Sequence, residues 1–133
     1  MSENLELVRS MYAAWERGDF DATEWAQSEI EFVFADGPSP GSWRGLSGMA
    51  EAMRDWLQAW EEVRQVPDGY RQLDDGRVLA LHVFTARGRK SGLELEHVRR
   101  AAAAVYTIHD GKVSRLVHYF DRNRALAELG LEE

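Results

Sequence analysis

The sequence predicts an α+β domain in which a curved antiparallel sheet wraps around helices from the N-terminal half. Helical patterns dominate residues 3–60, interrupted by one strand, whereas strand patterns dominate residues 62–121. The pairs Asp75-Gly76 and Asp110-Gly111 each lie between apolar runs. They indicate β-hairpins, because Gly tolerates the positive φ that such turns need. A chain of 133 residues fits one domain, which we expect to span residues 1–133.

The first half of the chain predicts three helices and one strand. Residues 3–16 carry an apolar stripe at helical spacing that includes Tyr12 and Trp15, and Gly18 ends this helix. A shorter helix is expected from Asp19 through Trp25 and Ala26. A strand at 29–35 follows, then a Pro/Gly loop at 36–42. The third helix runs from about Ser47 to Trp60.

The second half predicts four strands and a closing helix. The strands cover residues 62–74, 78–87, 93–108 and 113–121, the first of them broken near Pro67-Asp68-Gly69. The terminal helix runs from Arg122 to Leu129, with Asp121 as N-cap and Gly130 as its end. Side chains alternate between the faces of a strand. On the last strand this places Ser114, Leu116, His118 and Phe120 on one face and Val113, Arg115, Val117 and Tyr119 on the other.

Two histidines stand out because they lie among apolar residues on faces expected to meet the core. His118 lies between Leu116 and Phe120, and His82 lies between Ala80 and Phe84, on what we take to be adjacent strands. A neutral imidazole can act as a general base near pH 7. The alternative is a core histidine bonded to a backbone carbonyl or a tyrosine hydroxyl. The residues alone leave both interpretations open.

Composition excludes several classes of function. The net charge of -7 disfavours nucleic acids and anionic membranes as partners. No apolar run reaches 18 residues, and the N-terminus lacks a basic start followed by an apolar core, so we expect neither a membrane span nor a signal peptide and place the protein in the cytoplasm. The chain has no Cys, and its four His lack the local spacing of zinc sites. We therefore expect no metal.

Short motifs in a fixed order resemble the SnoaL-like branch of the nuclear-transport-factor-two-like superfamily. They are Leu7-Val8-Arg9-Ser10-Met11-Tyr12-Ala13-Ala14-Trp15, Gly18-Asp19-Phe20, Trp43-Arg44-Gly45-Leu46-Ser47-Gly48, Asp110-Gly111-Lys112-Val113 and the ending Tyr119-Phe120-Asp121-Arg122. The resemblance covers nearly the whole chain. It implies a cystatin-like cone with an internal pocket between the sheet and the helices. It does not choose among isomerases, cyclases, dehydratases, epoxide hydrolases and binding proteins, all of which use this fold.

The resemblance narrows the chemistry through residues that are present or missing. The resemblance places the two acids of the epoxide-hydrolase type near Phe84 and His118 and its Arg near His82, so both acids are absent. In the cyclase type, His118 would replace the acidic base. The dehydratase type, with a His pair, a Tyr and an Asp, is the closest match, and Asp36 is the nearby loop acid. The expected function is a cofactor-independent isomerase, cyclase or dehydratase acting by proton transfer on a small apolar, ketide-like or polycyclic ligand.

Two other classes of function stay open: a non-catalytic small-molecule binding or accessory protein, and an interaction module whose cone is filled. We expect His118, His82 and Tyr12 to be catalytic. The expected pocket walls are Trp15, Trp43, Arg44, Met53, Trp56, Phe84, Ala101, Ala103, Leu116 and Phe120. A homodimer is expected through the outer sheet face, which carries Leu79, Leu81, Val83, Val117 and Tyr119 and is too apolar to be left wet. No cofactor is implied.

Overall fold

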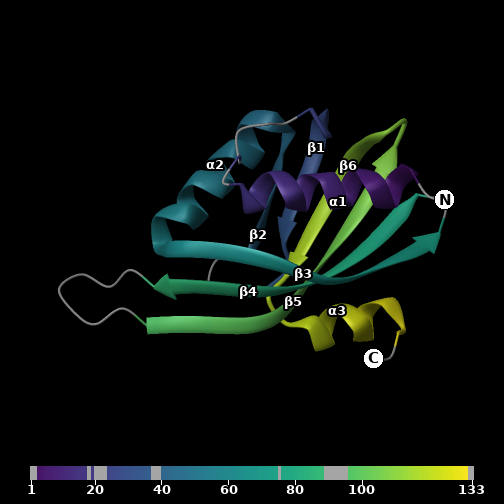
Figure 1. The fold of residues 1–133 in the computed structure, drawn as a ribbon. Coiled ribbons are helices and arrows are strands. Elements are labelled where there is room, and N and C mark those ends of the chain that lie inside the picture. Colours follow the sequence, from purple (N-terminus) through teal and green to yellow (C-terminus); the bar gives the residue numbers. More distant parts are fainter. Residues whose placement is uncertain are drawn as a thin grey trace.

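The computed structural model describes residues 3–17, 19, 24–36, 40–74, 76–88 and 96–131, with side chains throughout except at 56–57, 59–63, 88 and 96–98. Figure 1 shows three helices and a long twisted sheet. The elements are α1 (Glu3–Glu16), β1 (Ala26–Phe34), β2 (Gly41–Arg44), α2 (Gly45–Ala59), β3 (Trp60–Asp74), β4 (Arg77–Gly88), β5 (Glu96–His109), β6 (Lys112–Tyr119) and α3 (Arg122–Leu129).

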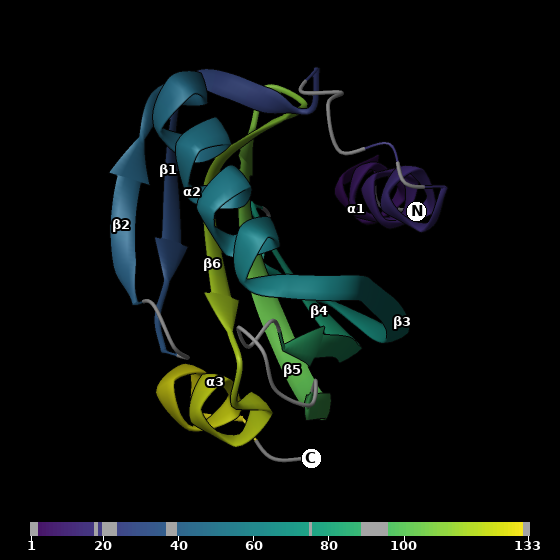
Figure 2. The same cartoon turned by 90° about the vertical axis from the view of Figure 1, so that its left-hand side faces the viewer.

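The strands form one open sheet in the order β2-β1-β6-β5-β4-β3. The predicted α+β class and the curved sheet are confirmed (Figure 2). The sheet is mixed, because β1 pairs with β6 in parallel whereas the other pairs are antiparallel. Strand β1 corresponds to the one strand predicted in the first half of the chain. Its parallel pairing with β6 places it beside the C-terminal hairpin, within the sheet.

Two helices cover the concave face of the sheet, and the third covers the opposite face. In Figure 2, α1 and α2 lie on the same side of the sheet and α3 lies apart from both. Helix α1 packs on β3 and β4, and α2 packs on β1 and β2. Helix α3 contacts β5 and β6. The expectation of helices on one face is therefore wrong for α3. No helix in the described ranges is long and apolar enough to span a membrane.

The hairpin of β5 and β6 forms at the predicted Asp-Gly turn. Asp110 (φ 53°) and Gly111 (φ 75°) both have positive φ, as a tight two-residue turn requires. A β-bulge follows, because Ile108 pairs with Val113 whereas Thr107 pairs with Arg115. As a result Val113 joins the same buried cluster as Leu116, although plain alternation put them on opposite faces.

Several local predictions need correction. Trp25 lies in a turn and Ala26 begins β1, so neither belongs to a second helix, and residues 20–23 lie outside the described part. The expected loop before the third helix contains the short edge strand β2. Strand β3 continues past Pro67 with a shift of register instead of breaking there. The predicted caps of α3 are confirmed: the side chain of Asp121 accepts from the backbone N–H of Asn123, and Gly130 is left-handed (φ 71°).

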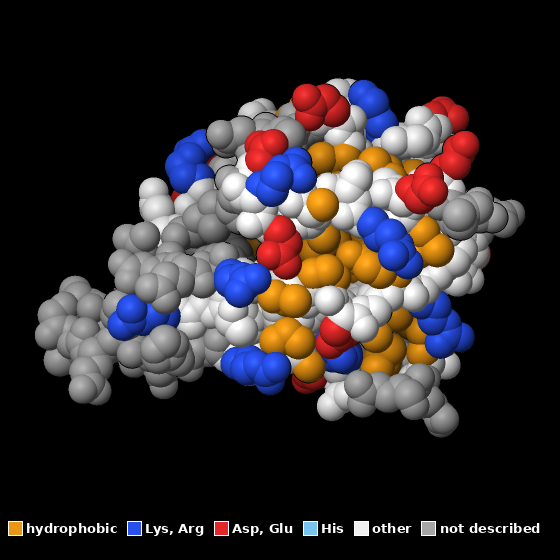
Figure 3. Space-filling model, viewed as in Figure 1, with side chains coloured by type: hydrophobic (Ala, Val, Ile, Leu, Met, Phe, Trp, Pro, Cys, Tyr) orange, Lys and Arg blue, Asp and Glu red, His pale blue; other side chains and the backbone are white. Residues whose placement is uncertain are grey.

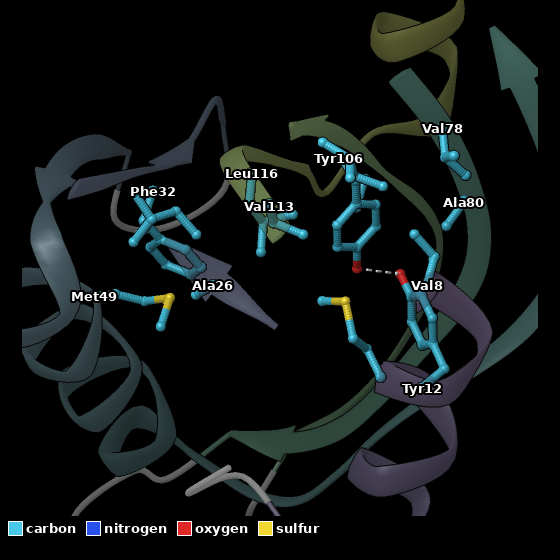
Figure 4. Packing of buried hydrophobic residues seen from close by; sticks show 14 of the residues in the cluster. Val8, Tyr12, Ala26, Phe32, Met49, Val78, Ala80, Tyr106, Val113 and Leu116 are labelled. Atoms are coloured by element: carbon cyan, nitrogen blue, oxygen red, sulfur yellow. Dashed lines mark hydrogen bonds between the residues drawn. The ribbon is translucent and has the colours of Figure 1, made fainter. Parts of the chain in front are cut away.

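Buried side chains form a separate cluster on each face of the sheet. The inner cluster lies under α1 and α2 and includes Val8, Tyr12, Phe32, Tyr106 and Leu116 (Figure 4). The outer cluster lies between the sheet and α3. It contains Leu79, Ala103, Val105, Val117, Tyr119, Ala125 and Leu126. Helix α3 of the same chain therefore covers much of the apolar surface for which the sequence predicted a second subunit.

Candidate functional site

His82 and His118 both belong to the inner face, where the sheet meets α1. His82 on β4 is 2% exposed and His118 on β6 is 8% exposed. They flank β5, so the expectation of adjacent strands is wrong. Two strand spacings across the sheet, combined with an offset of two residues along β5, place their backbones about 12 Å apart. The β5 residues opposite them are Ala102 and Ala104, whose methyl groups fill little of the space between the two imidazoles.

A chain of hydrogen bonds holds His82 from the side of α1. The hydroxyl of Tyr12 lies 3.0 Å from Nδ1 of His82. The hydroxyl of Tyr106, on β5, donates to the Tyr12 hydroxyl at 3.0 Å. Figure 4 shows these two hydroxyls pointing toward one another from the helix and the sheet. Both tyrosines are buried, so the pKa of each is raised above its ordinary value and each stays a neutral donor.

The imidazole of His118 lies among aromatic rings and makes no hydrogen bond to a described residue. Its ring centroid lies 5.4 Å from that of Phe32 and 5.5 Å from that of Phe34. Trp43 packs edge-on against Phe34. A buried polar group normally has a hydrogen-bond partner. No ring nitrogen of His118 is among the fully buried, unpartnered polar atoms of the described residues, so this imidazole can be reached by a ligand or water.

Burial keeps both imidazoles neutral at pH 7. Loss of solvation, helped by the nearby Arg122 cation, lowers the pKa of His82 to about 4. Loss of solvation, helped by His82, lowers the pKa of His118 to about 3. Neutral imidazole offers one N–H donor and one nitrogen acceptor. Each histidine can thus accept a proton at neutral pH, but each is a weaker base than a solvent-exposed histidine.

Arg122 fastens the backbone of the His82 strand from the other side. Its guanidinium donates to the carbonyl of His82 at 3.0 Å, to the carbonyl of Ala102 at 3.2 Å and to the carboxylate of Asp68 at 3.0 Å. His82 lies opposite Pro67 on β3, and proline has no N–H to donate. Arg122 supplies a donor at this position. This role could not be predicted from the sequence, in which Arg122 is recognisable only as the first residue of a helix.

Most of the predicted wall residues lie on the inner face, and three do not. Trp15, Trp43, Met53 and Leu116 belong to the inner cluster or pack against it, and Phe84 and Phe120 pack together beside Ala102. Ala103 lies in the outer cluster and Ala101 is exposed, so neither lines the inner face. Arg44 is exposed opposite Glu31, and the next residue on the strand, Trp43, points inward. The side chain of Trp56 lies outside the described part.

Asp36 has a structural task instead of a catalytic one. Its carboxylate accepts from the backbone N–H groups of Phe120 and Asp121, where the chain leaves β6. It therefore anchors the end of the strand that carries His118. Within the described ranges, no group of three or more His, Cys, Asp or Glu residues is placed to hold a metal ion.

The arrangement combines one neutral imidazole without a protein partner, a second imidazole held by a tyrosine pair, and aromatic walls. Such a set can accept a proton from a ligand and donate hydrogen bonds to it within an apolar surround. Tyr106 belongs to this set, although the sequence analysis missed it. Its signal was a hydroxyl-bearing aromatic residue directly after the apolar run at residues 101–105.

Comparisons with known proteins agree with this fold. A family model described as the SnoaL-like domain matches residues 8–116. A structure of an NTF2-like protein of unknown function from Burkholderia pseudomallei is 19% identical, covers 96% of this chain and 97% of its own, and has a TM-score of 0.79. A structure of a candidate polyketide cyclase from Xanthomonas campestris pv. campestris is 19% identical, covers 96% of each chain and has a TM-score of 0.76.

A third structure, of TerC crystallised with polyporic acid, is 21% identical, covers 96% of this chain and 98% of its own, and also has a TM-score of 0.76. No curated protein matches the chain. Because these identities are low, the solved structures establish the likeness of fold. The family match covers most of the chain, includes Tyr12, His82 and Tyr106, and ends two residues before His118. On the strength of that match, this chain belongs to the SnoaL-like domain family.

Proposed function

We propose that this protein is a cofactor-independent enzyme that moves a proton on a small apolar ligand held between His82 and His118. The observation that carries the proposal is the imidazole of His118: it is buried among Phe32 and Phe34 without a hydrogen bond to a described residue. A purely structural imidazole at this depth would be expected to have a protein partner. His118 therefore serves as the base, and His82, held by Tyr12, serves as the donor.

The proposed step transfers one proton and forms an ion pair between the His118 imidazolium and the enolate of the ligand. An imidazole nitrogen of His118 takes a proton from the carbon next to a ligand carbonyl, and the electron pair of that C–H bond moves onto the carbonyl oxygen. A hydrogen bond from the His82 side stabilises the resulting enolate. His118 then returns the proton to a different carbon or to the oxygen. The outcome is an isomerisation, or a ring closure when the enolate carbon attacks a second carbonyl of the same ligand.

The weakness of the base limits which ligands can react. A pKa of about 3 for His118 makes it a poor acceptor for protons from ordinary ketones. A carbon that lies between two carbonyls holds its proton less tightly, because both oxygens share the negative charge. Ketide chains and hydroxylated polycyclic diones contain this arrangement. The aromatic and methionine side chains around the histidines suit the flat apolar part of such a molecule.

The solved relatives support the same class of ligand. TerC was crystallised with polyporic acid, and the Xanthomonas protein is described as a candidate polyketide cyclase. This likeness supports the proposal without naming the substrate of the present protein.

The test begins with a thermal-shift screen of cyclic 1,3-diketones and hydroxyquinones. A ligand at 100 times its Kd should stabilise the fold by about 2.7 kcal/mol. With a turned-over ligand in hand, His118→Ala should reduce the rate by a factor of about 10² to 10⁴. His109→Ala is the matched control, because this imidazole lies in the β5–β6 turn and its side chain is 75% exposed. Equal activity of His118→Ala and wild type would refute the role of base.

A non-catalytic binding protein is the second candidate, and the low basicity of His118 favours it. A neutral imidazole that never ionises could serve only as a hydrogen-bond partner for a bound ligand. In that case ligands would raise the melting temperature and His118→Ala would weaken binding, but no ligand would be converted. The turnover assay on the ligands found by the screen separates the two candidates.

A further inference from the structure

We infer that Tyr12 is a positioning residue: with its oxygen engaged by Tyr106, it donates to Nδ1 of His82 and holds this imidazole in the tautomer with its proton on Nε2, so that His82 presents an N–H donor to the ligand. The inference rests on the proposed function for its chemical meaning, but the tautomer itself is a property of the free protein. The groups that carry it are the two hydroxyls and the imidazole, joined in one line by hydrogen bonds of 3.0 Å.

The direction of these two hydrogen bonds follows from the hydroxyl that would otherwise have no acceptor for its proton. Each tyrosine hydroxyl has one proton, and neutral imidazole has one on either Nδ1 or Nε2. Tyr106 is 0% exposed, and its hydroxyl meets no acceptor among the described residues other than Tyr12. Its proton therefore goes to the oxygen of Tyr12. Tyr12 must then donate to Nδ1 of His82, which leaves the proton of the imidazole on Nε2.

The opposite direction leaves a buried proton unpaired. If Nδ1 of His82 carried the proton, it would donate to Tyr12, and Tyr12 would donate to Tyr106. The proton of Tyr106 would then face no acceptor in a fully buried place, which is costly. The first arrangement instead leaves Nε2–H of His82, at the tip of the ring, without a partner among the described residues. This is the atom that a ligand oxygen can reach.

The tautomer decides what His82 can do. With Nδ1 engaged by Tyr12 and the proton on Nε2, His82 donates to a ligand oxygen on which negative charge develops. The base is then left to His118 alone. Arg122 supports the same division, because its cation bonds the backbone of His82 and disfavours a second proton on the ring. The two histidines are alike in burial, but the tyrosine pair gives them different roles.

Nitrogen-15 NMR of histidine-labelled protein tests the inference without a ligand, because protonated and unprotonated ring nitrogens have separate shifts. Wild-type His82 should show a protonated Nε2 and an unprotonated Nδ1. Tyr12→Phe removes the hydroxyl that donates to Nδ1 of His82, so the ratio of the two tautomers should move toward Nδ1–H by about tenfold, the change that corresponds to about 1.4 kcal/mol. Tyr70→Phe is the matched control, since its ring lies 6.0 Å from that of Tyr12 but its hydroxyl is outside the line.

Two results would overturn the inference: wild-type His82 protonated on Nδ1, or an unchanged tautomer ratio in Tyr12→Phe. Circular dichroism checks that the variant is folded, and the wild-type spectrum alone decides the matter if it is not. In a turnover assay, Tyr12→Phe should lower kcat more than it changes KM, because the donor acts on charge that develops during the reaction. If wild type converts no ligand, the proposed function fails while the tautomer result still stands.

Discussion

Acid should destabilise this protein through His82 and His118. A histidine in the unfolded chain takes up a proton near pH 6.5. In the folded protein, burial lowers the pKa of His82 to about 4 and that of His118 to about 3. Between these values the unfolded state binds more protons than the folded state, so the free energy of unfolding falls as the pH is lowered. The stability from keeping both imidazoles neutral is fully present above about pH 6.5. It is lost progressively below that pH, and the loss is complete near pH 4 for His82 and near pH 3 for His118.

The size of the effect is large compared with the stability of a small domain. Lowering the pKa of one histidine from 6.5 to about 4 corresponds to about 3 kcal/mol. Between pH 6.5 and 5.0 each of the two histidines should remove roughly 2 kcal/mol. The total stability of such domains is about 5–15 kcal/mol. Above pH 5, unpaired carboxylates stay largely ionised, so this window reports mainly on histidines.

Urea unfolding followed by tryptophan fluorescence, at several pH values from 5.0 to 7.5, measures this dependence. His118→Gln should remove about half of the loss, because Gln takes up no proton in this range. His109→Gln should keep the wild-type dependence, since this side chain is 75% exposed. If wild type and His118→Gln lost the same free energy of unfolding between pH 6.5 and 5.0, His118 would not be a source of the acid sensitivity.

Two further predictions concern the outer side of the sheet. Arg122→Met removes a cation and three hydrogen bonds, so it should cost about 2–3 kcal/mol of unfolding free energy and raise the pKa of His82 in an NMR titration. Arg124→Met loses only an exposed ion pair with Glu128 and should cost less than about 1 kcal/mol. Equal costs for the two variants would contradict the stabilising role of Arg122. We also propose a homodimer through the outer-face row Val66, Val83 and Ala101, which α3 leaves open. Light scattering should give twice the chain mass at micromolar concentration, and a monomer would contradict it.

Helix α3 covers most of the apolar face for which the sequence predicted a second subunit. On the face drawn in Figure 3, the hydrophobic side chains between α1 and α3 are interrupted by Arg, Lys, Asp and Glu side chains. Val66 is 36% exposed, whereas Leu79, Val117 and Tyr119 of the originally expected interface are at most 8% exposed in the single chain. The apolar pattern on these strands was correct, and the covering element is α3 of the same chain for most of it.

The sequence predicted the elements well where one local signal dominated. The apolar stripe of α1, the Asp-Gly turn of the β5–β6 hairpin and the caps of α3 each depend on neighbouring residues, and all three are confirmed. Strand β2 was missed because its four residues carry no alternating pattern and gain their conformation from pairing with β1. The helix expected at Trp25 failed for a similar reason, since the backbone carbonyl of Trp25 accepts a hydrogen bond from Val113 on β6.

The wrong faces of Ala101 and Ala103 follow from one inserted residue. Counting back from the Asp110-Gly111 turn without a bulge pairs Ala103 with His118. The bulge beside Thr107 shifts this register by one, so Ala104 lies opposite His118 and Ala103 opposite Tyr119. A shift of one residue moves side chains to the other face. Nothing in the local sequence announces the bulge, and it also explains the inward position of Val113.

The polar residues at the centre of the candidate site could be predicted from the sequence, but the hydrogen bonds that hold them could not. His82, His118 and Tyr12 were identified because polar groups on apolar faces are rare and informative. Tyr106 and Arg122 act through contacts with residues far away in sequence, Tyr12 and His82 respectively. Such contacts depend on the pairing of β4 with β5 and on the position of α3. They could be assigned only once the fold had placed those elements together.

Deuterium exchange measures directly whether His118 moves a proton on a ligand carbon. A ligand found by the thermal-shift screen is incubated in D₂O with wild type or with His118→Gln, and deuterium at the carbon next to its carbonyl is followed by NMR. Gln keeps a hydrogen-bonding group at this place but cannot accept the proton near pH 7. Our account predicts exchange with wild type that falls by a factor of about 10² to 10⁴ in His118→Gln. Exchange at the same rate in both proteins would contradict it.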